Sequence, residues 1–301
     1  MTNYAVYLKE FMQWCEYPED AVVSLLNDYD KLHENEEIGR RFDALVDLFD
    51  RDMLFNYQTA LELIRGYSEA CGVPWQAGHL LFALCLSRHT KELYAAKGLD
   101  DAIYRMSMLD MKWKVIECHK HFGIHGSVAG YWFERFFRVD RFALGRLQFE
   151  PAYAYADYEK DGMHIHKGDV VINMHIPSCG PMTVEGCMDS FRQAEAFFKD
   201  LFPGKPVPFM CNSWLLYPEH ENMLDENTNI RKFMSFFDIV EGYEDEKGGN
   251  LWRIFYEHDY SDPSKLPQNT SLQRAYVKLL SSGKHAGSGI GYFFMKDGEI
   301  L

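Results

Sequence analysis

The sequence predicts a mixed α+β protein, with an all-helical N-terminal domain over residues 1–130 and an α/β domain around a central mixed β-sheet over residues 131–301. In the first part, apolar residues recur every three or four positions, as in "AVVSLLNDYDKLHENEEIGRRFDALVDLF". From residue 142 onward, short β-rich runs are separated by turns and amphipathic helical segments. Because no Pro/Gly-rich linker separates the two parts, we expect them to pack closely.

Composition limits the classes of function. At 301 residues and 47% hydrophobic content, the chain can bury a large core, and its net charge of -14 disfavours nucleic acid as a partner. The sequence has no run of about 18 apolar residues and no signal-peptide pattern at its start, so we expect no membrane association. Seven widely spaced cysteines without a Cys-x-x-Cys pair suit reduced thiols, which predicts a cytoplasmic protein.

Helical patterns follow one another in the first part. They cover residues 21–49, 55–73, 71–99 and 100–123. Gly72 and Pro74 mark the end of one helix and the start of the next, and Gly98 is expected to terminate a helix.

Strands and helices alternate in the second part. Strands are expected over residues 141–150, 152–158, 169–176, 207–216, 237–243, 251–259 and 290–296, and helices over 183–202, 227–237 and 271–283. We expect the strands on either side of the 183–202 helix to be parallel, joined by a right-handed crossover. The "EKGG" segment is expected to form a hairpin turn, and "SGKHAGSGIGYFF" a flexible entry to the last strand.

A strand, a tight turn and a helix meet at "VVINMHIPSCGPMTVEGCMDSFRQAEAFF" with no spare linker. The unpaired N–H groups and positive dipole end of such a helix suit an anionic ligand such as a pyrophosphate. The same pattern is also that of an ordinary connection, since turn chemistry alone explains Gly180 and Pro181.

Four motifs in order give the second part a family resemblance. They are "LGRLQFE", "HIPSCGPM" followed by "SFRQAEAFF", "CNSWLLYP" and "NTNIRKFMSFF". On these motifs the chain resembles the GNAT-like C-terminal domain of bacterial N-acyltransferases, in which an all-helical domain precedes it. The resemblance implies a sheet that splays between the strand ending near His175 and the strand near Met210, with acyl-CoA as co-substrate in the cleft.

The resemblance also implies where the donor binds. Its pyrophosphate is expected on the turn that carries Ser178, Cys179, Gly180, Met182 and Thr183. The usual loop of the superfamily reads Arg/Gln-x-x-Gly-x-Gly/Ala, whereas this turn has one glycine, a proline without an N–H, and a glutamate in the following helical turn.

Acyl transfer needs a base for the acceptor and a proton donor for the departing thiolate. His175, at the end of a strand, is the first candidate base and Glu150 the second; each is also explained by a structural role. Where many relatives carry a tyrosine acid this chain has phenylalanine, so Tyr217 is the candidate donor, and Ser213 or its neighbour Asn212 could stabilise the oxyanion.

Other chemistries are less well supported by the residue pattern. Cys179 near a helix N-terminus, with a histidine four residues upstream, allows a covalent acyl-enzyme. The histidines of "HIH" and "CHKHFGIH" lack a carboxylate or cysteine at a familiar ligand spacing, so no metal is expected.

Two classes of function follow from these observations. The first is an acyltransferase that moves an acyl group from acyl-CoA to an amine or hydroxyl of a small-molecule acceptor. The second is a catalytically silent GNAT-like scaffold for ligand sensing or protein interaction, because a fold does not dictate a function.

Overall fold

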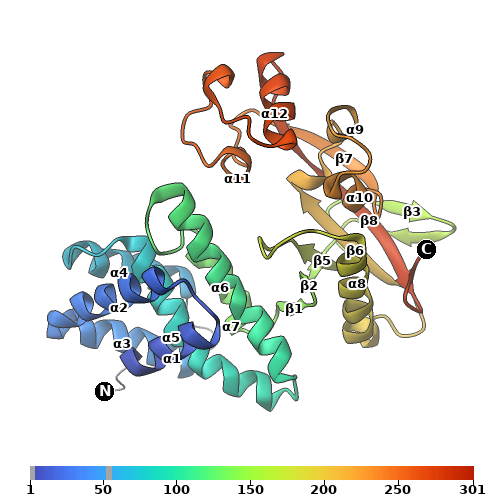
Figure 1. Ribbon diagram of the computed structural model, residues 1–301. Helices are drawn as coiled ribbons and strands as arrows, with labels where there is room; N and C mark the ends of the chain where they lie inside the picture. The colour runs from blue at the N-terminus through green and yellow to red at the C-terminus, as the bar shows by residue number, and fades with distance from the viewer. Residues whose placement is uncertain (1–3, 52–55) are drawn as a thin grey trace. The chain divides into compact units, whose positions relative to one another are not determined.

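The computed structural model describes residues 4–51 and 56–301, and the contacts within the chain divide it into two compact units, Met1–Ala143 and Leu144–Leu301. The first unit is helical and the second is built around a β-sheet, which confirms the predicted fold class (Figure 1). Within the described residues, no helix is both long enough and apolar enough to cross a bilayer.

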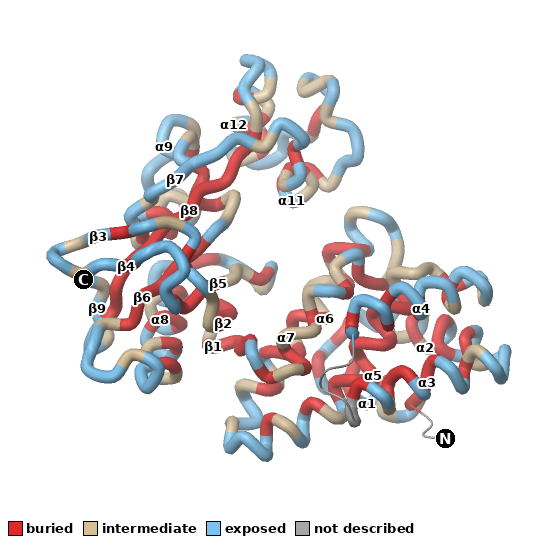
Figure 2. The backbone as a smooth tube through the Cα atoms, turned by 180° about the vertical axis from the view of Figure 1, so that it is seen from behind, coloured by how far each residue is buried: buried red, intermediate tan, exposed pale blue. Residues whose placement is uncertain are grey.

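The first unit is built from six helices of two or more turns in the described residues. These are α1 (Tyr4–Trp14), α2 (Glu19–Glu34), α3 (Glu36–Arg51), α4 (Tyr57–Ala70), α5 (Trp75–Ala96) and α6 (Asp101–Phe122). Helix α5 is the central one, because it packs against α1, α2, α3, α4 and α6 and its middle turns are buried (Figure 2). Gly98 adopts a left-handed φ of 70° directly after the C-cap of α5, as predicted.

A short segment after α6 completes the first unit. The 3-10 helix η1 (Gly130–Phe133) and helix α7 (Glu134–Phe137) pack against α5, and η1 also packs against α4. The Tyr57 hydroxyl donates a hydrogen bond to the Gly130 carbonyl, and the Phe137 ring lies beside the Tyr57 ring. The contacts therefore place residues 131–143, which were expected with the second domain, in the helical unit.

A seven-stranded mixed sheet organises the second unit, in the order β1-β2-β5-β6-β8-β7 with β9 paired to β8. Its strands are β1 (Phe142–Leu144), β2 (Leu147–Tyr153), β5 (Val170–His175), β6 (Val207–Ser213), β7 (Asp238–Asp245), β8 (Ala286–Lys296) and β9 (Glu299–Ile300). A separate hairpin consists of β3 (Tyr158–Lys160) and β4 (Met163–Ile165). The strand expected over 152–158 is thus divided between the end of β2 and the start of β3.

Strands β5 and β6 are parallel, as predicted, and their pairing is short. Only Ile172 with Phe209 and Asn173 with Met210 are paired in this ladder. Beyond these pairs, β5 continues beside β2 as far as His175, and β6 continues beside β8 as far as Ser213. This divergence is the splay that the sequence led us to expect.

Helix α8 (Val184–Phe198) covers one face of the sheet with aromatic contacts. The Phe191 ring on α8 lies 5.0 Å from the Phe293 ring and 6.3 Å from the Phe209 ring, centroid to centroid. On the opposite face, the β3–β4 hairpin places Tyr158 against Tyr292 in the cluster that includes Met210. Figure 2 shows the central strands β6 and β8 buried along most of their length.

Two expectations for the C-terminal region were wrong. The segment expected as a strand over 251–259 forms the short helix α11 (Trp252–Phe255), so the "EKGG" segment joins no hairpin. Leu251, Ile254 and Phe255 are buried together against α12 (Ser271–Ser281), and their spacing is helical.

The glycine-rich segment lies inside strand β8, which is buried along its first ten residues. A Cβ atom at Gly289 would lie 2.1 Å from the carbonyl oxygen of Leu216, and one at Gly287 would lie 2.3 Å from the Tyr217 ring. The glycines therefore let the 3-10 helix η3 (Trp214–Leu216) and the residue after it lie directly on the sheet. They do not form a flexible entry.

Candidate functional site

The turn before α8 leads into a capped and exposed helix N-terminus. Thr183 is the N-cap of α8, with its hydroxyl oxygen accepting a hydrogen bond from the Gly186 N–H at 3.1 Å. Ser178, Gly180 and Pro181 are exposed, Cys179 is half-buried and Met182 is buried. Gly180 has a φ of 110°, a backbone conformation that residues with a side chain rarely adopt, although a Cβ atom there would meet no atom within 4 Å.

Arg146 holds this turn from the residue before β2. Its Nη2 donates to the Gly180 carbonyl at 2.8 Å, and its Nε donates to the Pro181 carbonyl at 3.0 Å. The C=O and N–H of a trans peptide point in opposite directions, so the Met182 N–H is directed away from the guanidinium. Arg146 thus fixes the turn and adds a positive charge beside the N-terminus of α8, while its Nη1 is buried without a protein partner.

Four polar side chains share one face of the β2–β5 pair. Gln148 lies opposite His175 and Glu150 opposite Asn173 in the antiparallel register, and residues two apart on a strand face the same side. Gln148, Glu150 and Asn173 are buried. We call these four residues the polar quartet.

A histidine–carboxylate pair lies at the centre of the polar quartet. The Nε2 atom of His175 lies 2.9 Å from the Glu150 carboxylate, and the two side chains are 19% and 7% exposed. Since the carboxylate can only accept, Nε2 is the protonated nitrogen of the ring, and in neutral imidazole Nδ1 carries the lone pair. The structure therefore brings the two candidate bases, Glu150 and His175, into direct contact.

Asn173 adjoins this pair. Its amide nitrogen lies 3.3 Å from His175 Nε2, while its Oδ1 is buried and has no partner. Turning the amide by 180° would place Oδ1, in place of the amide nitrogen, next to the Nε2–H, where it can accept a hydrogen bond. Asn173 is then a second acceptor that helps hold the imidazole in one orientation.

The other two catalytic candidates hold structural hydrogen bonds. The Ser213 hydroxyl accepts from the Leu215 N–H at 3.2 Å as the N-cap of η3. The Tyr217 hydroxyl donates to the His285 carbonyl at 3.3 Å, and burial raises its pKa, with smaller contributions from Glu244 and Glu219. Cys179 likewise donates its S–H to the Arg146 carbonyl at 3.5 Å.

Arg146, Gln148 and Asn173 were not among the site residues that the sequence predicted. Two signals were available: Arg146 is in the "LGRLQFE" motif, and Asn173 precedes His175 by two residues, so both must lie on one face of the strand. The contact of Arg146 with a turn about 35 residues later had no local signal.

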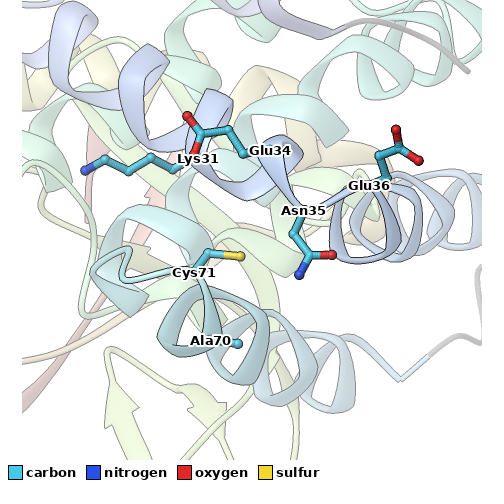
Figure 3. A pocket seen from close by; sticks show the side chains of 6 residues that line it. All are labelled: Lys31, Glu34, Asn35, Glu36, Ala70 and Cys71. Carbon is cyan, nitrogen blue, oxygen red and sulfur yellow. The ribbon is translucent and has the colours of Figure 1, made fainter.

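Pockets are present elsewhere in both units. In the first unit, a pocket of about 550 Å³ lies where α2, α3 and the end of α4 meet (Figure 3), and it is lined by Lys31, Glu34, Asn35, Glu36, Ala70 and Cys71. In the second unit, a pocket of about 450 Å³ lies beside the start of β7, with Arg231 and Asp238 among its lining residues. Neither pocket includes a residue of the turn or of the polar quartet.

Comparisons with known proteins agree with this architecture. Residues 7–139 match the N-acyltransferase N-terminal domain, and residues 142–293 match the GNAT-like C-terminal domain. A comparison with curated proteins found no match.

Several solved structures share the fold. A crystal structure of an acyltransferase in complex with decanoyl-CoA and teicoplanin is 21% identical, with a TM-score of 0.63 over 96% of this chain and 99% of that chain. An acyltransferase variant in complex with octanoyl-CoA has a TM-score of 0.62 at the same identity and coverage. At this identity the likeness establishes a common fold over nearly the whole chain.

Proposed function

Because this chain belongs to the family that joins an N-acyltransferase N-terminal domain to a GNAT-like C-terminal domain, we propose that it transfers an acyl group from acyl-CoA to an amine or hydroxyl of a small-molecule acceptor. The observation that carries the proposal is that β5 ends in a partly buried histidine–carboxylate pair and leads, through a short turn, into an exposed helix N-terminus. The acyltransferases of the same fold were crystallised with CoA, acyl-CoA or teicoplanin.

The turn formed by Ser178, Cys179, Gly180, Met182 and Thr183 is the proposed site of the donor pyrophosphate. Exposed backbone, the positive end of the α8 dipole and the Arg146 guanidinium together favour a polyanion. Glu185 in the first turn of α8 opposes it, and the arginine charge offsets this repulsion. The divergence of β5 from β6 supplies a route along which the pantetheine arm would continue into the sheet.

His175 is the proposed general base. It would take the acceptor proton at Nδ1 while Nε2–H stays bonded to the Glu150 carboxylate, which stabilises the imidazolium that forms. The nucleophile then attacks the thioester carbonyl, the tetrahedral intermediate collapses, and CoA leaves as the thiol after receiving a proton. Because Tyr217 and Ser213 hold structural hydrogen bonds, we propose the imidazolium as the source of that proton.

The location of the protein is part of the proposal. All seven cysteines are free thiols in the structure, which suits the reducing cytoplasm. The small-molecule acceptor is proposed by analogy with the teicoplanin complex of a protein with this fold.

Calorimetric titration with acetyl-CoA and with longer acyl-CoAs, followed by single-turnover assays, tests the proposal. We expect His175→Ala to lower turnover by roughly 10²-fold or more and to leave acyl-CoA affinity nearly unchanged. The matched control is His166→Ala, since His166 is exposed just after the β3–β4 hairpin. Arg146→Gln should instead weaken acyl-CoA binding, whereas Arg192→Gln on α8, where the arginine contacts Gly298, should not.

The competing function is a catalytically silent scaffold. If acyl-CoA fails to bind at millimolar concentration, both donor site and enzyme are refuted and the scaffold is favoured. If acyl-CoA binds but His175→Ala turns over as fast as the unaltered protein, the donor site stands and the base assignment is wrong.

A further inference from the structure

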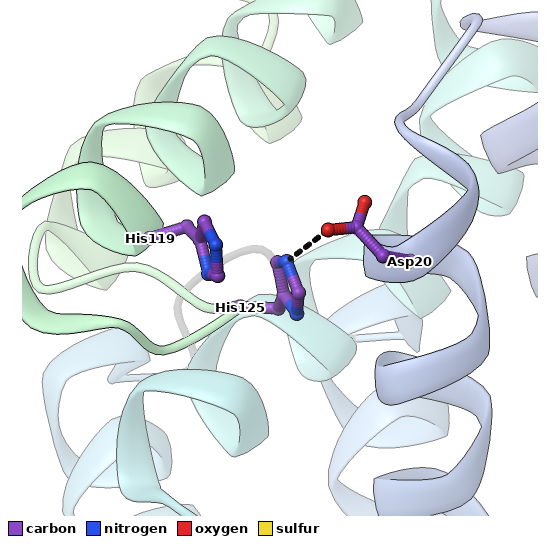
Figure 4. A group of neighbouring side chains, drawn as sticks. All are labelled: Asp20, His119 and His125. Atoms are coloured by element: carbon purple, nitrogen blue, oxygen red, sulfur yellow. Dashed lines mark ion pairs between the residues drawn. The ribbon is translucent and has the colours of Figure 1, made fainter.

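Three potential metal ligands meet in the helical unit. Asp20, His119 and His125 each offer a ligand atom, and these atoms all lie within 4.8 Å of one another (Figure 4). The His125 Nε2 lies 3.5 Å from an Asp20 carboxylate oxygen, and the rings of His119 and His125 face each other with centroids 4.1 Å apart. We call these three residues the His–Asp cluster.

The fold fixes the residues of the cluster from three directions. Asp20 lies in the first turn of α2, and His119 lies in the last turn of α6. His125 lies in the loop that follows Gly123, whose left-handed φ of 69° ends α6 and whose N–H donates to the His119 carbonyl. Two of the three ligands are thus tied together by the cap of one helix.

The loop that carries His125 is pressed against the start of α5. A Cβ atom on Gly126 would lie 2.4 Å from the backbone carbon of Gln76, so the loop requires glycine at this position. The next residue, Ser127, donates its N–H to the Gln76 carbonyl at 2.9 Å. These contacts hold His125 next to α2, where its side chain is 13% exposed.

We propose that Asp20, His119 and His125 bind one divalent transition-metal ion of the zinc class. Two imidazoles and a carboxylate match the donor set of three-ligand zinc sites, in which water completes the tetrahedron. Metal–nitrogen bonds of about 2.0–2.1 Å place tetrahedral ligand atoms about 3.4 Å apart, close to the observed His125–Asp20 separation of 3.5 Å.

Binding requires one of the two rings to rotate out of the stacked arrangement. The two imidazole planes are 5° from parallel, so their nitrogen lone pairs run side by side and do not converge on one point. His119 is exposed at the helix end, so its ring can rotate about χ1 and χ2 without displacing the core, while His125 stays in place.

The surrounding charges favour a cation. The C-terminal end of α6 carries a partial negative charge beside His119, and Asp28 lies close enough to interact electrostatically with His125. Glu19 and Asp20 offset the positive N-terminal end of α2. Asp28 is buried and lies 3.6 Å from the Lys31 ammonium group, which offsets part of its charge.

The consequence of binding is a link between α2 and the loop after α6, two segments about 100 residues apart in sequence. The proposal does not depend on acyl transfer, because all three ligands belong to the helical unit. Its failure would leave the proposed function untouched.

Zinc titration of the full-length chain, first treated with a chelator, tests the site by calorimetry and thermal unfolding. We expect one equivalent to bind, and zinc at a hundredfold excess over Kd to raise Tm by roughly 5–10 °C. His119→Ala and Asp20→Asn should each lower the affinity at least tenfold. Both side chains are exposed, so chelated variants should unfold at the same temperature as the parent chain.

Two controls separate the cluster from other ligands. The variant with His164→Ala and His166→Ala removes the other neighbouring histidine pair, whose ring centroids are 6.5 Å apart, and should bind zinc normally. Cobalt should give a tetrahedral spectrum without thiolate charge-transfer bands. The proposal is overturned if zinc binds no tighter than millimolar, if affinity survives both cluster variants, or if cobalt reports cysteine ligation.

Discussion

His220 provides a stability prediction whose size follows from its surroundings. The side chain is fully buried, with Nε2 2.7 Å from the Tyr276 hydroxyl and Nδ1 3.4 Å from the Leu215 carbonyl. A carbonyl can only accept, so Nδ1 carries the proton and Nε2 accepts from the tyrosine. His220 thereby joins η3 to α12 as a neutral imidazole.

Burial lowers the pKa of His220 from 6.5 to about 4, with the nearby Arg231 charge adding to the effect and the Leu215 carbonyl opposing it. Between these pH values the unfolded chain binds a proton that the folded chain does not. The contribution to stability is therefore complete above about pH 6.5 and is lost as pH falls towards 4. The difference of about 2.5 pH units, at about 1.4 kcal/mol each, amounts to about 3 kcal/mol.

Native-state hydrogen exchange of the α12 amides measures this loss locally, since α12 carries Tyr276. From pH 7 to about pH 4, the unaltered chain should lose about 3 kcal/mol more than His220→Gln, which cannot take up the proton. Comparing the two chains cancels the titration of all other groups. Parallel pH profiles, or a His220 NMR titration midpoint near 6.5, would refute the reasoning.

Three further predictions concern other positions. Gly289→Ala should destabilise the second unit by about 3 kcal/mol in urea unfolding, since its methyl group would collide with the Leu216 carbonyl; a cost under about 0.5 kcal/mol would contradict the contact. Thr183→Ala removes the N-cap of α8 and should cost about 1 kcal/mol in the same assay, with Thr183→Ser as the control. Burial lowers the pKa of His33, but its hydrogen bonds, chiefly to Asp43, give a net rise in that pKa. The contribution of His33 to the free energy of unfolding is therefore complete below about pH 6.5 and declines as the pH rises through the higher folded pKa. Asp43→Asn should flatten the decline of the urea midpoint between about pH 6 and 8, and an unchanged slope would count against this assignment.

Local patterns predicted the part of the fold that local physics determines. Helical periodicity located α4, α5 and α6 and the residues of α2 and α3, but it did not separate α2 from α3 and gave no helix for α1. The run from Val170 to Phe198 correctly indicated a strand, a turn and a helix. The parallel pairing of β5 and β6 followed from the intervening helix. In each case the residues that give the signal are close in sequence to the element that they predict.

The errors arose where apolar residues fit two periods. In "LWRIFYEHD" the β-rich composition favoured a strand, yet Leu251, Ile254 and Phe255 are spaced as on a helix, and Tyr256 ends that helix with a left-handed φ of 56°. The His–Asp cluster could not be predicted either, because nothing near His119 in the sequence indicates that Asp20 will lie beside it. Contacts between residues far apart in sequence determine both the α11 helix and the His–Asp cluster.

The proposed pyrophosphate turn before α8 differs from the usual pattern of the superfamily, and Arg146 offsets part of the difference. The usual loop carries its own positive or amide side chain and two small residues, whereas this turn has Pro181, which lacks an N–H, and is followed by Glu185. Arg146, the residue before β2, brings a positive charge to the turn and donates to the carbonyls of Gly180 and Pro181. Since both carbonyls point at the guanidinium, the Met182 N–H points the other way, and an N–H at residue 181 would have pointed the other way too. Proline at position 181 therefore removes one backbone donor from the side of the turn that faces the proposed anion, and the Met182 N–H and the Arg146 charge remain to favour binding there.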